Sequence, residues 1–322
     1  MRRFIALART AALESLAEPL SAVVFLAALL VVHLAPVFHY HRFGDAARLP
    51  RECGLSALLV FGLVFATSAA VRTIGRELSS GTASAALALA VPRWLFHCAK
   101  TAGVFAAFAL FAAAATSATL LAARTSALGA EIAATGADVR IWGPGLAFGA
   151  GGTLLAFAAA AAANRFLRWR FCASACLLTA AAQPFALVMS VPAGGFAEKG
   201  AFISEAVLLL PSFAVLAAAC LVFIALAAAL ATRLDSARVT AALVSAVLLS
   251  FFAGQVDRAC PAAGWAVRSV LPVLSDFWTA DRLVGGGALS AAETCRLVAS
   301  AVLLVAFWLG AGSALLSRRE LP

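Results

Sequence analysis

Residues 71–100 (VRTIGRELSSGTASAALALAVPRWLFHCAK) form a charged, glycine-punctuated segment between two long apolar runs. Arg72, Arg76 and Glu77 lie at its start, and Lys100 lies where the next apolar run begins. The Ala- and Leu-rich residues 82–91 favour a helix, and Pro92 ends it because the proline ring excludes the hydrogen bond of the preceding turn. We therefore expect a short helix that lies along one membrane face without crossing it; an ordinary basic interfacial loop is the alternative.

The composition around this segment is that of a polytopic membrane protein. The chain has 322 residues, of which 64% are hydrophobic and 12% are charged, and its mean hydropathy is +1.00. Soluble domains carry roughly 25% charged residues. Apolar runs of about 20 residues span a bilayer as helices. We predict one all-α domain over residues 1–322, a membrane helix bundle with about eight transmembrane helices, within a range of six to eight. The expected spans are residues 19–37, 54–72, 100–122, 144–163, 171–191, 205–231, 239–254 and 296–316.

The charge distribution predicts the topology. The net charge is +9, and 14 of the 24 Lys and Arg residues, with 5 of the 15 acidic residues, fall on the side of the N-terminus, when Arg72 and Lys100 are counted there. The other side carries equal numbers of cations and carboxylates. This asymmetry follows the positive-inside rule, so we expect a multi-pass protein of the inner (plasma) membrane with both termini in the cytoplasm. The basic charge then reports topology, and no nucleic-acid partner is expected.

Two segments outside the spans have distinct patterns. Residues 1–18 predict an amphipathic helix on the inner membrane face. Residues 255–295 form the longest extracytoplasmic segment, and Cys260 and Cys295 within it could pair on an oxidising side, with Cys53 as a competitor.

Polar residues are rare within the expected spans. We expect His33 to face other helices, and Gln183 beside Pro184 to mark a kink, with a direct transport role as the alternative. Gly149, with its small neighbours, favours close helix contact. His39 and His41 are too few ligands to predict a metal site.

Motifs for chemistry are missing from the sequence. It has no Gly-x4-Gly-Lys-Ser/Thr phosphate-binding loop and no catalytic constellation, and the scarcity of intramembrane acids argues against a proton pump. We therefore expect no cofactor, and any ATP that powers the protein is bound by a separate polypeptide.

The pattern of residues 71–100 resembles a known family. Its members carry an Arg/Glu pair, Gly-Thr, a Leu-rich turn, Pro with a basic residue, and then Lys. Here these are Arg76-Glu77, Gly81-Thr82, Leu87 and Leu89, Pro92-Arg93, and Lys100. The C-terminal region adds Leu271-Pro272, Phe277, a glycine turn at 285–287, and Arg318-Arg319-Glu320-Leu321. Together these resemble the type-2 ABC transporter permeases, the transmembrane subunits of ABC exporters, whose core has six spans.

The resemblance implies a function and partners. The chain would be a transporter subunit and not itself an enzyme, and it would pair with a second permease chain, identical or not, in the lipid bilayer and bind an ABC ATPase subunit. Residues 73–99 would be the cytoplasmic coupling segment that the ATPase pushes. The substrate stays open, and export is favoured over import only by the resemblance.

The same resemblance implies roles for single residues. Arg76 and Glu77 would contact the ATPase groove, with Gly81 and Thr82 forming the turn. Pro92 would end the coupling helix, and Arg93 with Lys100 would anchor it at the lipid headgroups. The alternatives are a membrane scaffold or assembly protein without transport activity and, with less support, an intramembrane enzyme.

Overall fold

The computed structural model describes residues 1–38, 45–81, 91–136, 141–190, 196–284 and 287–319. Within these ranges all regular structure is helical, which confirms the predicted all-α bundle. In chain order the helices are α1 (Arg2–Ala17), α2 (Pro19–Leu34), η1 (Ala35–Val37), α3 (Arg48–Ala70), η3 (Val71–Arg76), α4 (Glu77–Ser79), α6 (Arg93–Ala134), α7 (Gly143–Leu146), η4 (Ala147–Gly151), α8 (Gly152–Leu167), α9 (Phe171–Ser190), α10 (Phe196–Ala231), α11 (Ser236–Ala259), α12 (Pro261–Val270), α13 (Leu274–Phe277), α14 (Ala280–Val284) and α15 (Ala291–Ser317).

Among the described residues, eight helical segments are long and apolar enough to cross a membrane. They are Pro19–Val37, Arg48–Arg76, Arg93–Ala134, Gly143–Leu167, Phe171–Ser190, Phe202–Ala231, Ser236–Ala259 and Ala291–Ser317. Each overlaps one predicted span, so the chain is a multi-pass membrane protein by helix length and apolar composition.

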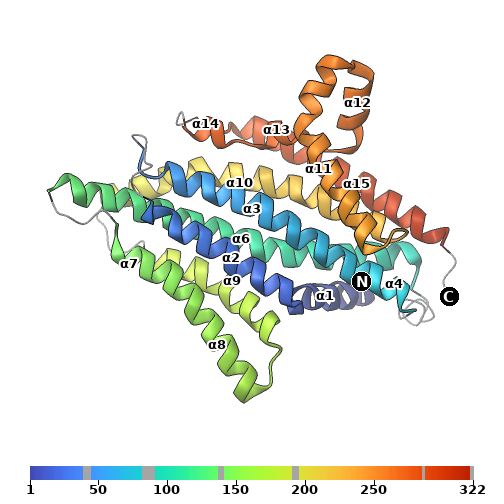
Figure 1. Cartoon of the computed structure of the whole chain (residues 1–322), viewed down its shortest axis with the longest axis horizontal. Helices are drawn as coiled ribbons and strands as arrows, with labels where there is room; N and C mark the ends of the chain where they lie inside the picture. Colours follow the sequence, from blue (N-terminus) through green and yellow to red (C-terminus); the bar gives the residue numbers. More distant parts are fainter. Residues whose placement is uncertain (39–44, 82–90, 137–140, 191–195, 285–286, 320–322) are drawn as a thin grey trace.

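Helices α3, α6 and α10 run side by side along the long axis and form the centre of the bundle (Figure 1). Helix α2 lies against α3 and α6, α15 against α10, and the α8–α9 hairpin extends to one side. The end that holds the last residues of α3, α10 and α15 and the first residues of α6 also holds both chain termini; we call it the terminal end. The opposite end, with the first turn of α3 and the last turns of α6, is called the far end.

Aromatic rings fill the contact between α2, α3 and α6. Phe25 packs against Phe65 and Phe111 with ring centroids 6.2 and 5.2 Å apart, and all three rings are fully buried. Such pairs contribute about 0.5–1.5 kcal/mol each beyond the area they bury. Glycine permits close approach elsewhere: a Cβ at Gly103 of α6 would lie 2.3 Å from the carbonyl oxygen of Ala8 in α1. The N-terminal helix is therefore packed against the bundle and does not lie only on lipid.

Several helices extend beyond the predicted spans, and the second and third do so most. The helix of the third span continues past residue 122, where the span was expected to end, as far as Ala134. Arg124 does not end the helix because its side chain is buried beneath aromatic rings, 5.7 Å from the centre of Trp142. The helix instead ends before Gly136, whose φ of +85° suits glycine. With 42 residues α6 is about 63 Å long, roughly twice the thickness of a bilayer core.

The second span likewise continues past residue 72. The π-helical turn η3 carries this span to Arg76, and the short α4, from Glu77 to Ser79, follows outside it. Pro184 and Pro211 lie inside α9 and α10, and both helices continue through them.

The segment 255–295 is largely helical. It contains the last turn of α11, then α12, α13 and α14, and Leu274 and Phe277 are buried against the bundle. Cys260 and Cys295 are both exposed free thiols, so the pairing left open by the sequence is not formed here.

Candidate functional site

The segment that the sequence singles out begins and ends at the terminal end of the bundle. Its first part, through η3 and α4, continues α3, and Gly81 follows with a φ of +75° that favours glycine. Its last part begins at Pro92, which is extended and immediately precedes α6. Residues 82–90, which include Thr82 and most of the predicted coupling helix, lie outside the described residues.

Lys100 ties the two ends of this segment together. Its Nζ donates to Oε1 of Glu77 at 2.5 Å and to Oε2 of Glu14 in α1 at 3.2 Å. We call these three residues the Lys100 cluster. The lysine side chain is 2% exposed, whereas Glu77 is 23% and Glu14 39% exposed. The cluster joins α4, α6 and α1, and because water is excluded from the lysine, removal of either carboxylate would be costly.

The protonation of Glu77 is set by two opposing effects. Partial burial is the largest single effect and raises the pKa of its carboxyl, the hydrogen bond and charge of Lys100 lower it, and the net pKa is above the usual value. Glu14 adds a smaller increase through like-charge repulsion. Glu77 is thus a carboxylate whose charge depends on the cation beside it.

Arg93 ties the start of α6 to the C-terminal end of α15. Its Nη1 donates to the carbonyl oxygens of Leu316, Ser317 and Arg319 at 3.1, 2.9 and 2.7 Å. The last carbonyls of a helix have no intrahelical partner and carry the negative end of its dipole, so a guanidinium there is favourable. Arg233 reaches the carbonyl of Leu315 in the same way, at 3.2 Å.

These contacts correct one predicted role. Lys100 does not face lipid headgroups, because its charge lies inside the bundle between two carboxylates. Glu14 was not predicted as a partner of Lys100, because the sequence pattern placed it only on an interfacial helix. Arg93 binds helix carbonyls, Arg76 is exposed, and Gly81 adopts the glycine conformation expected of a turn.

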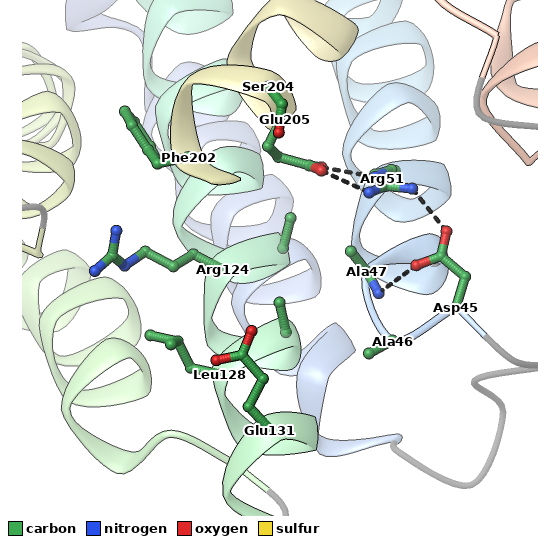
Figure 2. Close-up of a pocket in the computed structure, with 12 residues that line it drawn as sticks. Asp45, Ala46, Ala47, Arg51, Arg124, Leu128, Glu131, Phe202, Ser204 and Glu205 are labelled. Carbon is green, nitrogen blue, oxygen red and sulfur yellow. Dashed lines mark hydrogen bonds and ion pairs between the residues drawn. The ribbon is translucent and has the colours of Figure 1, made fainter. Parts of the chain in front are cut away.

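A second charged site lies at the far end (Figure 2). Arg51 of α3 donates to both carboxylate oxygens of Glu205 in α10 at 2.6 and 2.5 Å and to Asp45 at 2.7 Å. The Arg51 and Glu205 side chains are 13% and 18% exposed. They border a cavity of 280 Å³ that Arg124 and Phe202 also line. Because Arg51 is held by two carboxylates, its clearest role is to join the far ends of α3 and α10; we call this pair the far-end latch.

A polar network crosses the bundle between α2, α8 and α9. Nε2 of His33 lies 2.8 Å from Oε1 of Gln183, and Nε2 of Gln183 donates to the hydroxyl of Thr153 at 2.8 Å. Because the Gln183 amide nitrogen is the donor to Thr153, its oxygen accepts from His33, which assigns the ring proton to Nε2. His33 therefore faces other helices, as predicted. Gln183 is a hydrogen-bonding residue between spans, and Thr153 is a partner that the sequence did not identify.

No metal centre is indicated. Within the described ranges, no group of three His, Cys, Asp or Glu side chains is placed to hold a metal ion. His39 and His41 lie outside the described residues.

Comparison with known proteins assigns no role to these sites. No protein-family model, curated protein or solved structure matches this chain.

Proposed function

We propose that the chain is the membrane-spanning permease subunit of an ATP-driven transporter of the type-2 ABC exporter kind, with both termini in the cytoplasm. The observation that carries the proposal is the Lys100 cluster. It joins the two ends of the 73–99 segment to each other and to α1, with Nζ–O distances of 2.5 and 3.2 Å. A partner that pushes on this segment would therefore move helices and not only a loop.

The contacts around the segment define where such a push would go. Through Glu77 it reaches α3, through Lys100 it reaches α6, and through Glu14 it reaches α1. Through Arg93 it reaches the end of α15, which packs along α10. Rigid helices linked by ion pairs transmit a displacement over their whole length, as hinge and shear transitions require.

The far-end latch supplies the second half of an alternating-access scheme. Arg51 and Glu205 hold α3 and α10 together at the far end, while the Lys100 cluster holds the terminal end. Opening one end while the other stays closed is a shift between two populated states, driven by the binding energy of the partner. In this proposal a separate ATPase subunit binds the ATP, and a second permease chain completes the pathway.

The proposal is tested by co-purification from native membranes. Tagged wild type is compared with Gly81→Pro, which excludes the φ of +75° found there, and with the matched control Gly81→Asn, which tolerates a left-handed backbone. A Cβ at Gly81 meets no atom of the described residues within 4 Å, so neither substitution clashes with the described bundle.

An ATPase that co-purifies with wild type and Gly81→Asn but not with Gly81→Pro supports the permease and its contact segment. If the ATPase co-purifies with all three forms, the proposed transporter function stands, but the proposed contact at residues 73–99 is refuted. No ATPase with any form refutes the permease and favours a membrane scaffold without transport activity.

A further inference from the structure

A strongly basic cavity lies at the terminal end, where α3 ends and α11 begins. Its volume is 610 Å³, within the roughly 300–1,000 Å³ typical of ligand pockets. The charged residues that line it are Arg72, Arg76, Arg233, Arg238, Arg319 and Asp235. Even when Glu18, which pairs with Arg72 at 2.7 Å, is included, cations exceed carboxylates by three among these described residues. A cavity of this charge fits an anion.

Within the described residues, several of these arginines use only part of their donors. A guanidinium has five N–H donors. Arg233 uses Nε for the carbonyl of Leu315, and Arg319 uses Nη1 for the carbonyl of Thr232 at 2.5 Å. These bonds fix the two side chains on the cavity wall. Arg238 is 74% exposed, and within the described part of the chain its side chain contacts Asp235 at 3.9 Å. Fixed guanidinium groups suit an oxyanion with several acceptor oxygens, above all a phosphate group.

An apolar groove continues directly from the basic cavity. The two share Val71, Arg72 and Ser236, and the groove has a volume of 430 Å³. Its walls come from α3, which contributes Leu63 and Val64, and from α11, which contributes residues as far along as Leu248. Arg72 thus lies at the junction of a charged and an apolar compartment.

The groove has the length of one lipid leaflet. At 1.5 Å per residue, it extends about 14 Å along α3 from Arg72 to Leu63, and about 18 Å along α11 from Ser236 to Leu248. Half of the hydrocarbon core of a bilayer is about 15 Å. Both helices belong to candidate membrane spans, and the groove runs along the half of each span that lies nearer the terminal end of the bundle. The groove therefore enters the membrane by the depth that an acyl chain occupies.

From this juxtaposition we propose that the chain has a specific site for an anionic phospholipid of the leaflet at the terminal end. The phosphate binds among the arginines of the basic cavity, and one acyl chain lies in the groove between α3 and α11. The groove provides shape selection more than affinity, because the surrounding lipid is as apolar as the protein. The site rests on the membrane-spanning fold and not on the proposed transporter function.

The test titrates purified full-length protein with phosphatidylglycerol, phosphatidylcholine or inorganic phosphate and counts bound ligands by native mass spectrometry. The charge variant is Arg72→Gln with Arg238→Gln, two side chains that are 48% and 74% exposed. Its matched control is Arg165→Gln with Arg170→Gln, two exposed arginines, the first in the last turn of α8 and the second in the turn that follows it. The groove variant is Thr240→Phe, which fills the groove from its lining, and its control is Ala241→Phe, an exposed neighbour outside the lining.

We expect wild type to retain phosphatidylglycerol in preference to phosphatidylcholine. An arginine near a membrane surface contributes about fivefold to the affinity for an anionic lipid, so the charge variant loses about 25-fold and its control loses little. Thr240→Phe weakens retention, whereas Ala241→Phe does not.

Three results would overturn the proposal. One is equal retention of phosphatidylglycerol by the charge variant and its control. Another is tight binding of inorganic phosphate that Thr240→Phe leaves unchanged, which would make the site one for a soluble anion. The third is a dimer that the groove variant dissociates, which would make the groove an interface between copies of the chain.

Discussion

Replacement of Lys100 by Met tests whether the Lys100 cluster holds the terminal end together. At an effective dielectric constant of about 20, a charge 2.5 Å from Glu77 is stabilised by about 6–7 kcal/mol, and one 3.2 Å from Glu14 by about 5 kcal/mol. Desolvation of a lysine that is 2% exposed offsets several kcal/mol of this, and Glu14, at 39% exposure, is screened by water. Breaking a buried pair costs about 3–5 kcal/mol, so we expect a loss of about 3 kcal/mol at neutral pH.

The loss also depends on pH. Without Lys100, the pKa of Glu77 loses the effect that lowers it, so the carboxyl takes up a proton more readily and the uncompensated charge disappears. Destabilisation by Lys100→Met is therefore expected to fall to about 1 kcal/mol in mild acid.

A thiol-reactive fluorophore measures this stability. Cys176 and Cys220 are buried and become reactive only on unfolding, after the exposed thiols of Cys260 and Cys295 have been blocked. Chemical unfolding is followed at neutral and at acidic pH for wild type, Lys100→Met and Glu14→Gln. A change of less than about 0.5 kcal/mol for Lys100→Met at neutral pH would refute the reasoning, since that is the range of an ordinary surface substitution.

Three further predictions use the same assay. Glu205→Gln should destabilise by about 1–2 kcal/mol, because Arg51 keeps Asp45 but loses its charged partner in α10. Glu52→Gln, which removes the charge from the half-exposed pair with Arg48, is the control and should stay within about 0.5 kcal/mol. Equal effects would contradict the far-end latch. Gly149→Ala should cost about 1–3 kcal/mol, since its Cβ would lie 2.4 Å from the His33 ring, whereas Gly152→Ala, with nothing within 4 Å, should not destabilise. Because the pKa of Glu77 is raised in the folded state, its contribution to stability is present below its unfolded pKa and is lost as pH rises through the folded value. As pH rises from the unfolded to the folded pKa of Glu77, the free energy of unfolding of wild type should therefore fall relative to that of Glu77→Gln. A relative increase over the same pH range would show that the charge of Lys100 outweighs burial.

The sequence predicted the class of fold well because membrane spans are determined locally. A run of about 20 apolar residues has to form a helix whatever surrounds it, and each of the eight predicted spans corresponds to a helix of the structure. Boundaries were less predictable. The third span was expected to end at residue 122, just before Arg124, but in the structure the charge of Arg124 lies against the rings of Trp142 and Phe202, and α6 continues.

The partners of the site residues could not be predicted in the same way. The pairing of Lys100 with Glu14 spans 86 residues, and the pairing of His33 with Gln183 spans 150. Neither has a local spacing that a sequence pattern reveals, because both depend on how the spans pack. The charge pattern correctly placed Lys100 at the terminal end of the bundle. It did not place Lys100 inside the bundle, because neither charge nor hydropathy along the sequence shows which side of a helix faces its neighbours.

The end of α3 links the two proposals physically. The π-helical turn η3 carries Arg72 and Arg76 on the wall of the basic cavity, and the next residue, Glu77, contacts Lys100. π-helical turns are rare and often mark functional sites, since they change which side of a helix the following residues face. This turn places neighbouring residues on different surfaces. Arg72 and Arg76 face the basic cavity, which is continuous with the apolar groove, and the carboxylate of Glu77 belongs to the Lys100 cluster. A bound phosphate beside Arg76 would add a negative charge near Glu77 and so favour its protonated form, which weakens the bond to Lys100. If both proposals hold, anion binding would oppose the ion pair between Lys100 and Glu77, and linkage would require each to weaken the other by the same factor.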